Sequence, residues 1–82
     1  MLYYLRRFSE ALKDYDQALA YDTDRLPVYY NRALVLDYLG RYEEASDSFK
    51  HYLTWSHPLQ DVAARRYARE RVEVIFGMRK GR

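Results

Sequence analysis

The sequence predicts an all-α protein of stacked antiparallel helical hairpins. A shift of 34 residues places the first half of the chain on the second, with aromatic, alanine and leucine positions in register. The aligned pairs are Phe8/Tyr42, Ala11/Ala45, Tyr15/Phe49 and Leu19/Leu53. These spacings lie on one helix face, and a period of this length is typical of a helical array. Short connections favour antiparallel neighbours, and no strand pattern competes.

The first elements expected are a helical stub and a full helix. Residues 2–5 match the last turn of a helix, and residues 9–21 carry apolar side chains at helical spacing. Ser9 occupies the place of an N-cap. Residues 22–24 form a polar cluster that is typical of a turn.

The middle of the chain predicts a helical hairpin. A helix over residues 27–39 begins at a proline, whose fixed φ suits a first helical turn. Gly40 supplies the left-handed residue that a tight connection prefers. A further helix covers residues 42–54 and ends before Pro58, because a residue preceding proline avoids the helical region. Near its end, Trp55 is expected to fill space under the last helix, with an exposed contact as the alternative.

The last of the five expected helical stretches covers residues 59–76. Gly77 is predicted to end it, which leaves residues 78–82 as a basic tail. Charge is distributed unevenly, because residues 1–58 carry a net charge of −2 (seven Lys/Arg against nine Asp/Glu) and residues 59–82 carry +4 (seven against three). Such asymmetry can steer an acidic partner toward one end.

Composition excludes several kinds of site. The chain of 82 residues has no cysteine, and therefore no disulfide and no thiolate zinc site. His51 and His57 are six apart and share no helix face, so no metal and no cofactor is expected. No apolar run approaches the roughly 20 residues of a membrane span. We expect a soluble, cytoplasmic protein without catalytic residues.

The predicted core is a seam of small and aromatic residues at helical spacing. It comprises Ala11, Tyr15, Ala18, Leu19, Tyr29, Ala33, Leu36, Tyr42, Ala45 and Phe49. Small residues at such a seam permit close approach of the helices, while large ones interdigitate.

These residues resemble the tetratricopeptide repeat (TPR), a helical unit of 34 residues. One complete unit reads Tyr29, Ala33, Leu36, Gly40, Tyr42, Ala45, Phe49 and Pro58, and the preceding unit retains Phe8, Ala11, Tyr15 and Ala18. The resemblance implies an α-solenoid with a right-handed superhelix, here a single domain over residues 1–77. Its parts would be a truncated repeat (1–25), a full repeat (26–58) and a capping helix (59–77).

The chain departs from the family pattern at four places. Arg32 replaces a leucine, Arg6 replaces the turn glycine, and Pro58 comes one residue late. In the last helix Arg71 falls on the position of Leu36. We therefore expect one weaker packing contact, a turn at Arg6 without glycine, and a last helix that serves as a cap with a polar outer face. The alternative is that the last helix is a divergent first helix of a further repeat.

The resemblance also implies a peptide-binding surface on the concave side of the array. The residues carried over to it are Tyr30, Asn31, Leu34, Asp37 and Tyr38, with Arg65 and Arg66 from the last helix. In family members that hold the carboxylate of an acidic C-terminal tail, an asparagine stands at the place of Asn31. Arginine would add a bidentate grip on that carboxylate. The alternative is that Asn31 is structural.

The expected function is a non-catalytic scaffold or chaperone-like adaptor for protein partners. The first alternative is nucleic-acid binding through the arginine-rich C-terminal helix, with Tyr67 or Phe76 stacking on a base. The cations that would meet phosphates are Arg65, Arg66, Arg69, Arg71, Arg79, Lys80 and Arg82. The second is an accessory segment of a larger enzyme or secretion complex. A homodimer through the N-terminal helices is also expected, to cover Phe8, Leu12, Tyr15 and Leu19.

Overall fold

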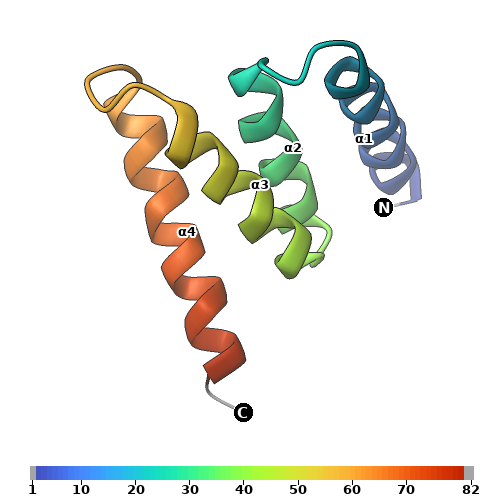
Figure 1. Cartoon of the computed structure of the whole chain (residues 1–82). Coiled ribbons are helices and arrows are strands. Elements are labelled where there is room, and N and C mark those ends of the chain that lie inside the picture. The colour runs from blue at the N-terminus through green and yellow to red at the C-terminus, as the bar shows by residue number, and fades with distance from the viewer. Residues whose placement is uncertain (1, 81–82) are drawn as a thin grey trace.

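Four α-helices make up the part of the chain that the structure describes. The computed structural model describes the backbone of residues 2–80 and the side chains of residues 7–78. The helices are α1 (Leu2–Tyr21), α2 (Leu26–Tyr38), α3 (Tyr42–Trp55) and α4 (Val62–Lys80). Each packs against the next one in the chain (Figure 1). The predicted all-α class of stacked helical hairpins is confirmed.

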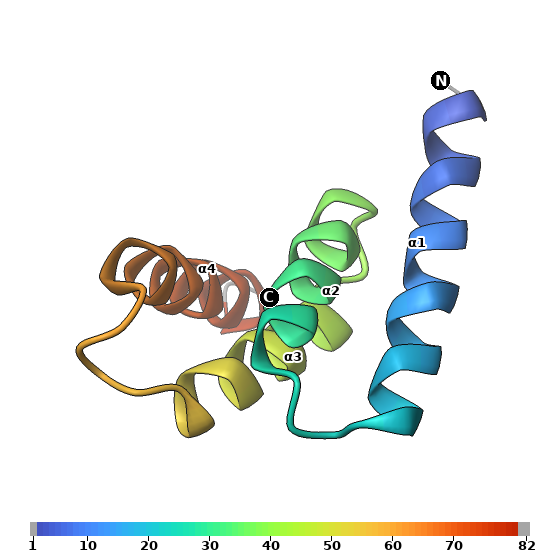
Figure 2. The ribbon, with the colours of Figure 1, turned by 90° about the horizontal axis from the view of Figure 1, so that it is seen from above.

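Helix α2 lies at the centre of a flat molecule. Seen from above, α1 and α4 stand on either side of α2, and α3 packs beneath it (Figure 2). The body measures 35 × 33 × 19 Å, so it is essentially two helices thick. In this arrangement one face of α2 is flanked by α1 and α4.

Helix α1 differs from the prediction of a stub and a second helix. It runs without interruption from Leu2 to Tyr21, and Ser9 lies inside it rather than at an N-cap. The turn expected at Arg6 does not form, because neither glycine nor proline occurs in this segment to interrupt the helical hydrogen bonds. The described part of the chain therefore has four helices instead of five.

The turn between α2 and α3 forms as the sequence predicts. Gly40 adopts φ +81°, the left-handed region that an L side chain rarely enters. The amide of Arg41 then donates a hydrogen bond to the carbonyl of Leu36 at 2.9 Å, which closes the end of α2. Helix α3 ends at Trp55, before Pro58, as expected.

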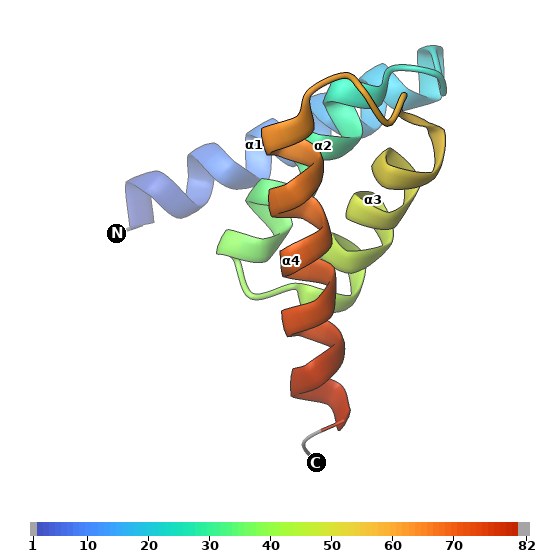
Figure 3. The same cartoon turned by 90° about the vertical axis from the view of Figure 1, so that its left-hand side faces the viewer.

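Helix α4 is shifted toward the C-terminus relative to the prediction. It begins at Val62 because residues 57–60 form a turn and Asp61 has φ +50°. Gly77 does not end it, since this glycine keeps a negative helical φ, and the helix continues to Lys80. Its last turns extend beyond the α2–α3 turn (Figure 3). Of the predicted basic tail, residues 81–82 lie outside the described residues.

The core is centred on α2, α3 and α4. Its buried apolar residues are Leu12, Ala33, Leu36, Ala45, Phe49, Tyr52, Ala68 and Ile75. Four of the ten predicted seam residues are among them, and Ala11, Tyr15, Ala18, Leu19 and Tyr29 are half-buried. Tyr42 was predicted wrongly, because it begins α3 and is 41% exposed. The expected plug at Trp55 is also wrong, because this side chain is 68% exposed.

Arg32 joins three helices where the family pattern has a leucine. Its Nε donates to the carboxylate of Asp16 in α1 at 2.7 Å, and its Nη1 donates to the hydroxyl of Ser48 in α3. Ser48 is buried, so the guanidinium satisfies a hydroxyl inside the α2–α3 contact. A polar link here replaces the apolar contact of the family pattern.

Candidate functional site

A small pocket lies where α2, α3 and the start of α4 meet. Its volume is about 190 Å³. The lining residues are Pro27, Tyr30, Asn31, Tyr52, Asp61 and Ala64. Two of them, Tyr30 and Asn31, belong to the predicted peptide-binding surface. The pocket combines tyrosine rings, one amide and one carboxylate, a mixture suited to holding a polar segment of polypeptide.

The tyrosines around this pocket form a contiguous aromatic cluster. The ring centroid of Tyr30 lies 5.1 Å from that of Tyr52 and 6.0 Å from that of Phe49. Phe49 in turn meets the ring of Tyr67 edge-on at 6.3 Å. These distances lie in the range of favourable aromatic contacts, so the rings hold one another in place.

Burial raises the pKa of the two tyrosine hydroxyls at the pocket, Tyr30 and Tyr52. The pKa of Tyr30 is raised above 10.0 by burial first, and then by the nearby hydroxyls of Tyr67 and Tyr52. The pKa of Tyr52 is raised by burial and by the carboxylate of Asp61, while Arg65 partly offsets this. Both side chains therefore remain neutral hydrogen-bonding groups at physiological pH.

An ion pair between Asp37 and Arg71 links α2 to α4. The carboxylate of Asp37 accepts two hydrogen bonds from Arg71, at 2.6 Å from Nε and 2.8 Å from Nη2. The Asp37 side chain is only 10% exposed, and this hydrogen bond is the main reason that the pKa of Arg71 is raised. The carboxylate of Asp37 is therefore occupied by a contact within the protein. Arg71, which stands where the family has an apolar residue, links α4 to α2.

The other residues carried over onto α2 lie on the same side of that helix but differ in exposure. Leu34 is half-buried and packs against the core. Tyr38 is 70% exposed, and its ring contacts Phe8 of α1 at a centroid distance of 4.6 Å. Asn31 is exposed beside the pocket. The face of α2 thus presents one aromatic, one amide and one partly covered leucine.

The two arginines expected to assist Asn31 line a different pocket. Arg65 and Arg66 share a hollow of about 130 Å³ with Pro58, Val62 and Arg69. The Nη1 atom of Arg65 donates to the backbone carbonyls of Leu53 and Ser56 at 3.2 and 3.1 Å, and also contacts the Ser56 hydroxyl. Arg65 therefore caps the C-terminal end of α3, where a cation is favoured.

Two of the six residues that line the pocket, Tyr30 and Asn31, were predicted as site residues from the sequence. Tyr52 was assigned to the interior face of its helix, and neither Asp61 nor Ala64 was assigned a role in the site. The missing signal is the left-handed φ of Asp61, which sets where α4 begins and which of its residues face α2. Aspartate tolerates a left-handed φ better than most residues. Its presence before a helix does not, however, predict that it adopts this conformation.

The described residues contain neither a metal-binding group nor a membrane-spanning helix. No group of three or more His, Cys, Asp or Glu side chains in this part of the chain lies close enough to hold a metal ion. Among the helices that the structure describes, none is long and apolar enough to cross a membrane.

Comparison with protein families identifies one repeat in the chain. Residues 26–56 match the family model of the tetratricopeptide repeat. The matched range covers α2, α3 and the turn between them, whereas α1 and α4 lie outside it. Searches of curated proteins and of solved structures found no significant match. The chain thus contains a tetratricopeptide repeat within a four-helix structure, and such repeats are typically non-catalytic protein-interaction units.

Proposed function

We propose that this chain is a non-catalytic protein-interaction module that binds a partner polypeptide along the face of α2 between α1 and α4. The observation that carries the proposal is the pocket of Tyr30, Asn31, Tyr52 and Asp61 at one end of that face. The exposed ring of Tyr38 extends the same side of α2 toward the other end. The repeat at residues 26–56 supports a protein as the partner.

Charge decides which kind of segment the pocket favours. The pocket beside Asn31 contains the carboxylate of Asp61 and neither lysine nor arginine among its lining residues. Arg65 is engaged with α3 carbonyls. An acidic C-terminal tail would place its carboxylate near Asp61, and like charges repel. The expected acidic tail is therefore less favoured than an extended segment whose backbone is held by Asn31 and the tyrosine hydroxyls.

Nucleic-acid binding has less support from the arginine cluster of α4. Arg71 pairs with Asp37, and Arg65 caps α3. Of the four arginines from 65 to 71, this leaves Arg66 and Arg69 to meet phosphates. A separate salt series decides between the two functions, because phosphate contacts lose affinity steeply as salt rises.

The test is a titration of the chain with a mixed peptide library and with a random single strand, at two salt concentrations. We expect peptide binding that changes only moderately with salt. Asn31→Ala should weaken it by about two- to tenfold, the effect of losing one hydrogen bond. Gln17→Ala removes a similar amide from an exposed position of α1 and is the matched control.

Two outcomes would overturn the proposal. One is a single strand that binds more tightly than any peptide, with a steep salt dependence. The other is a loss of peptide affinity that is as large for Gln17→Ala or Arg82→Ala as for Asn31→Ala. Circular dichroism of each variant shows whether its helix content is retained.

A further inference from the structure

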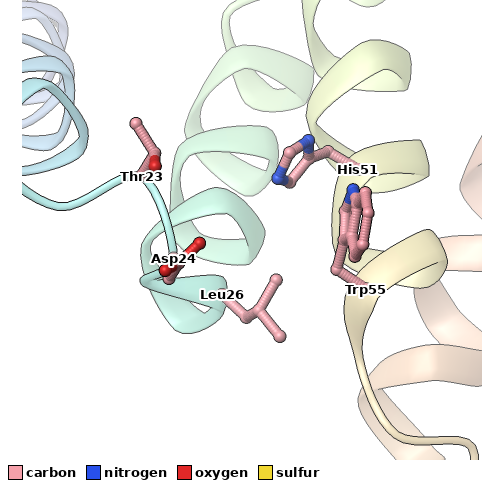
Figure 4. A pocket seen from close by; sticks show the side chains of 5 residues that line it. All are labelled: Thr23, Asp24, Leu26, His51 and Trp55. Atoms are coloured by element: carbon pink, nitrogen blue, oxygen red, sulfur yellow. The ribbon is translucent and has the colours of Figure 1, made fainter.

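A second pocket lies away from the α2 face, between the α1–α2 turn and the end of α3. Its volume is about 400 Å³. Its lining residues are Thr23, Asp24, Leu26, His51 and Trp55 (Figure 4). None of them lines the pocket beside Asn31, so the two sites are separate. Nothing in the proposed function uses this second pocket.

One wall of the second pocket consists of ordered aromatic rings. The indole of Trp55 is 68% exposed and lies 6.3 Å from the ring of His51. His51 stacks on Tyr29 of α2, with a centroid distance of 3.8 Å and an interplanar angle of 27°. The stacked pair fixes the inner part of the wall, while the indole remains open to solvent. Tryptophan is enriched among the residues that contribute most to binding at protein interfaces.

The opposite side of the pocket carries a carboxylate without a charged partner. Asp22 accepts the amide hydrogen of Asp24 at 3.0 Å and pairs with Arg25 at 3.6 Å. Asp24 itself forms no ion pair with any side chain among residues 7–78. Asp24 and Thr23 face His51 and Trp55 across the opening (Figure 4). The lining thus has one negative charge and neither lysine nor arginine.

We propose that this pocket binds an arginine side chain of a protein partner. The guanidinium would lie between the Asp24 carboxylate and the indole face of Trp55, and its aliphatic stem would cover Leu26. Cations are attracted to the faces of aromatic rings, most strongly to that of tryptophan. The planar guanidinium also donates hydrogen bonds to a carboxylate in a fixed geometry. This occupant matches the charge, the rings and the apolar floor together.

Fluorescence provides a direct test, because Trp55 is the only tryptophan of the chain. The probe is an acetylated and amidated Gly/Ser peptide with a single arginine, and its neutral counterpart carries citrulline instead. We expect a saturable change of Trp55 emission with the arginine peptide and none with the citrulline peptide. Asp24→Asn keeps the reporter and should weaken binding by roughly two- to fivefold, as for an exposed charge pair.

The matched control is Asp47→Asn, which removes the same charge from an exposed position of α3 that lines neither pocket. Its affinity for the arginine peptide should equal that of the parent. An equal response to citrulline, equal losses in the two variants, or no saturable change would each overturn the assignment. Asn31→Ala should leave this titration unchanged, so its result does not depend on the function proposed for the α2 face.

Discussion

At the scale of single residues, arginines replace apolar contacts of the repeat by polar ones. Arg32 reaches Asp16 and Ser48 from the place of a leucine. Arg71 clasps Asp37 across the gap between α4 and α2. Both guanidiniums are partly exposed, so they remain partly solvated while each donates two hydrogen bonds to other helices. These two arginines thus link neighbouring helices at positions where the family pattern has apolar contacts.

The raised pKa of a tyrosine at the pocket predicts that the stability of this protein falls at alkaline pH. The folded-state pKa of Tyr52 is raised above 10.0, mainly by burial. A raised pKa means that the folded state holds the proton more firmly, so this contribution is complete below about pH 10 and is lost as pH rises through the folded-state pKa. Tyr52→Phe should therefore reduce the fall in unfolding free energy above pH 10.

Urea unfolding curves measured at pH 8 to 12 check this prediction. Tyr21→Phe is the control, because Tyr21 is almost fully exposed. A variant at Tyr52 whose pH dependence equals that of the parent would show that burial does not raise this pKa.

At the scale of the elements, the α2–α3 hairpin depends on small residues where the helices cross. Ala33 and Ala45 are completely buried, and each lies in the core beside Leu36 and Phe49. Packing in protein interiors is dense, so such a contact has no room for additional atoms. The alanine of α1 that corresponds to Ala45, Ala11, is only half-buried.

Ala45→Leu should overpack the hairpin and destabilise the protein by about 1 to 3 kcal/mol. Ala11→Leu is the matched control at the equivalent position of α1, and it should cost much less because that face is open. The free energy of unfolding from urea titration is the measurement. Equal effects of the two substitutions would contradict the register in which Ala11 and Ala45 correspond.

At the scale of the whole molecule, α1 is covered on one side only. The residues that we expected a second copy to cover differ in their surroundings. Leu12 is buried and Phe8 packs on Tyr38 of α2. The face that corresponds to the buried residues of α3 instead carries Ala11, Tyr15 and Ala18, all half-buried. The surface of α1 that could form a homodimer contact is therefore smaller than the sequence suggested.

The homodimer remains a prediction, and substitutions on α1 can test it. We expect sedimentation to show concentration-dependent dimerisation in the micromolar range, because apolar faces associate. Ala18→Glu should abolish it, whereas Ala20→Glu, at an exposed position of α1, should not. A parent chain that sediments as a monomer throughout this range, with its helix content intact, would refute the dimer.

The helical class, the α2–α3 hairpin and the left-handed conformation of Gly40 were all predictable from the sequence. These features follow from local rules: a repeated apolar spacing, a proline in the first turn and a glycine at the end of a helix. Tyr30 and Asn31 were carried over to one surface from the resemblance to the repeat family, and both line the pocket where α2, α3 and the start of α4 meet.

The contacts of the long side chains and the ends of α1 and α4 depend on how the helices pack, and the sequence did not predict them. Arg65, predicted beside Asn31, caps α3, and Trp55, predicted beneath α4, faces solvent. A long flexible side chain can reach several partners from one backbone position, so sequence spacing does not select among them. Gly77 shows the same limit, because a glycine near a predicted helix end does not by itself stop the helix, and α4 continues through Gly77 to Lys80.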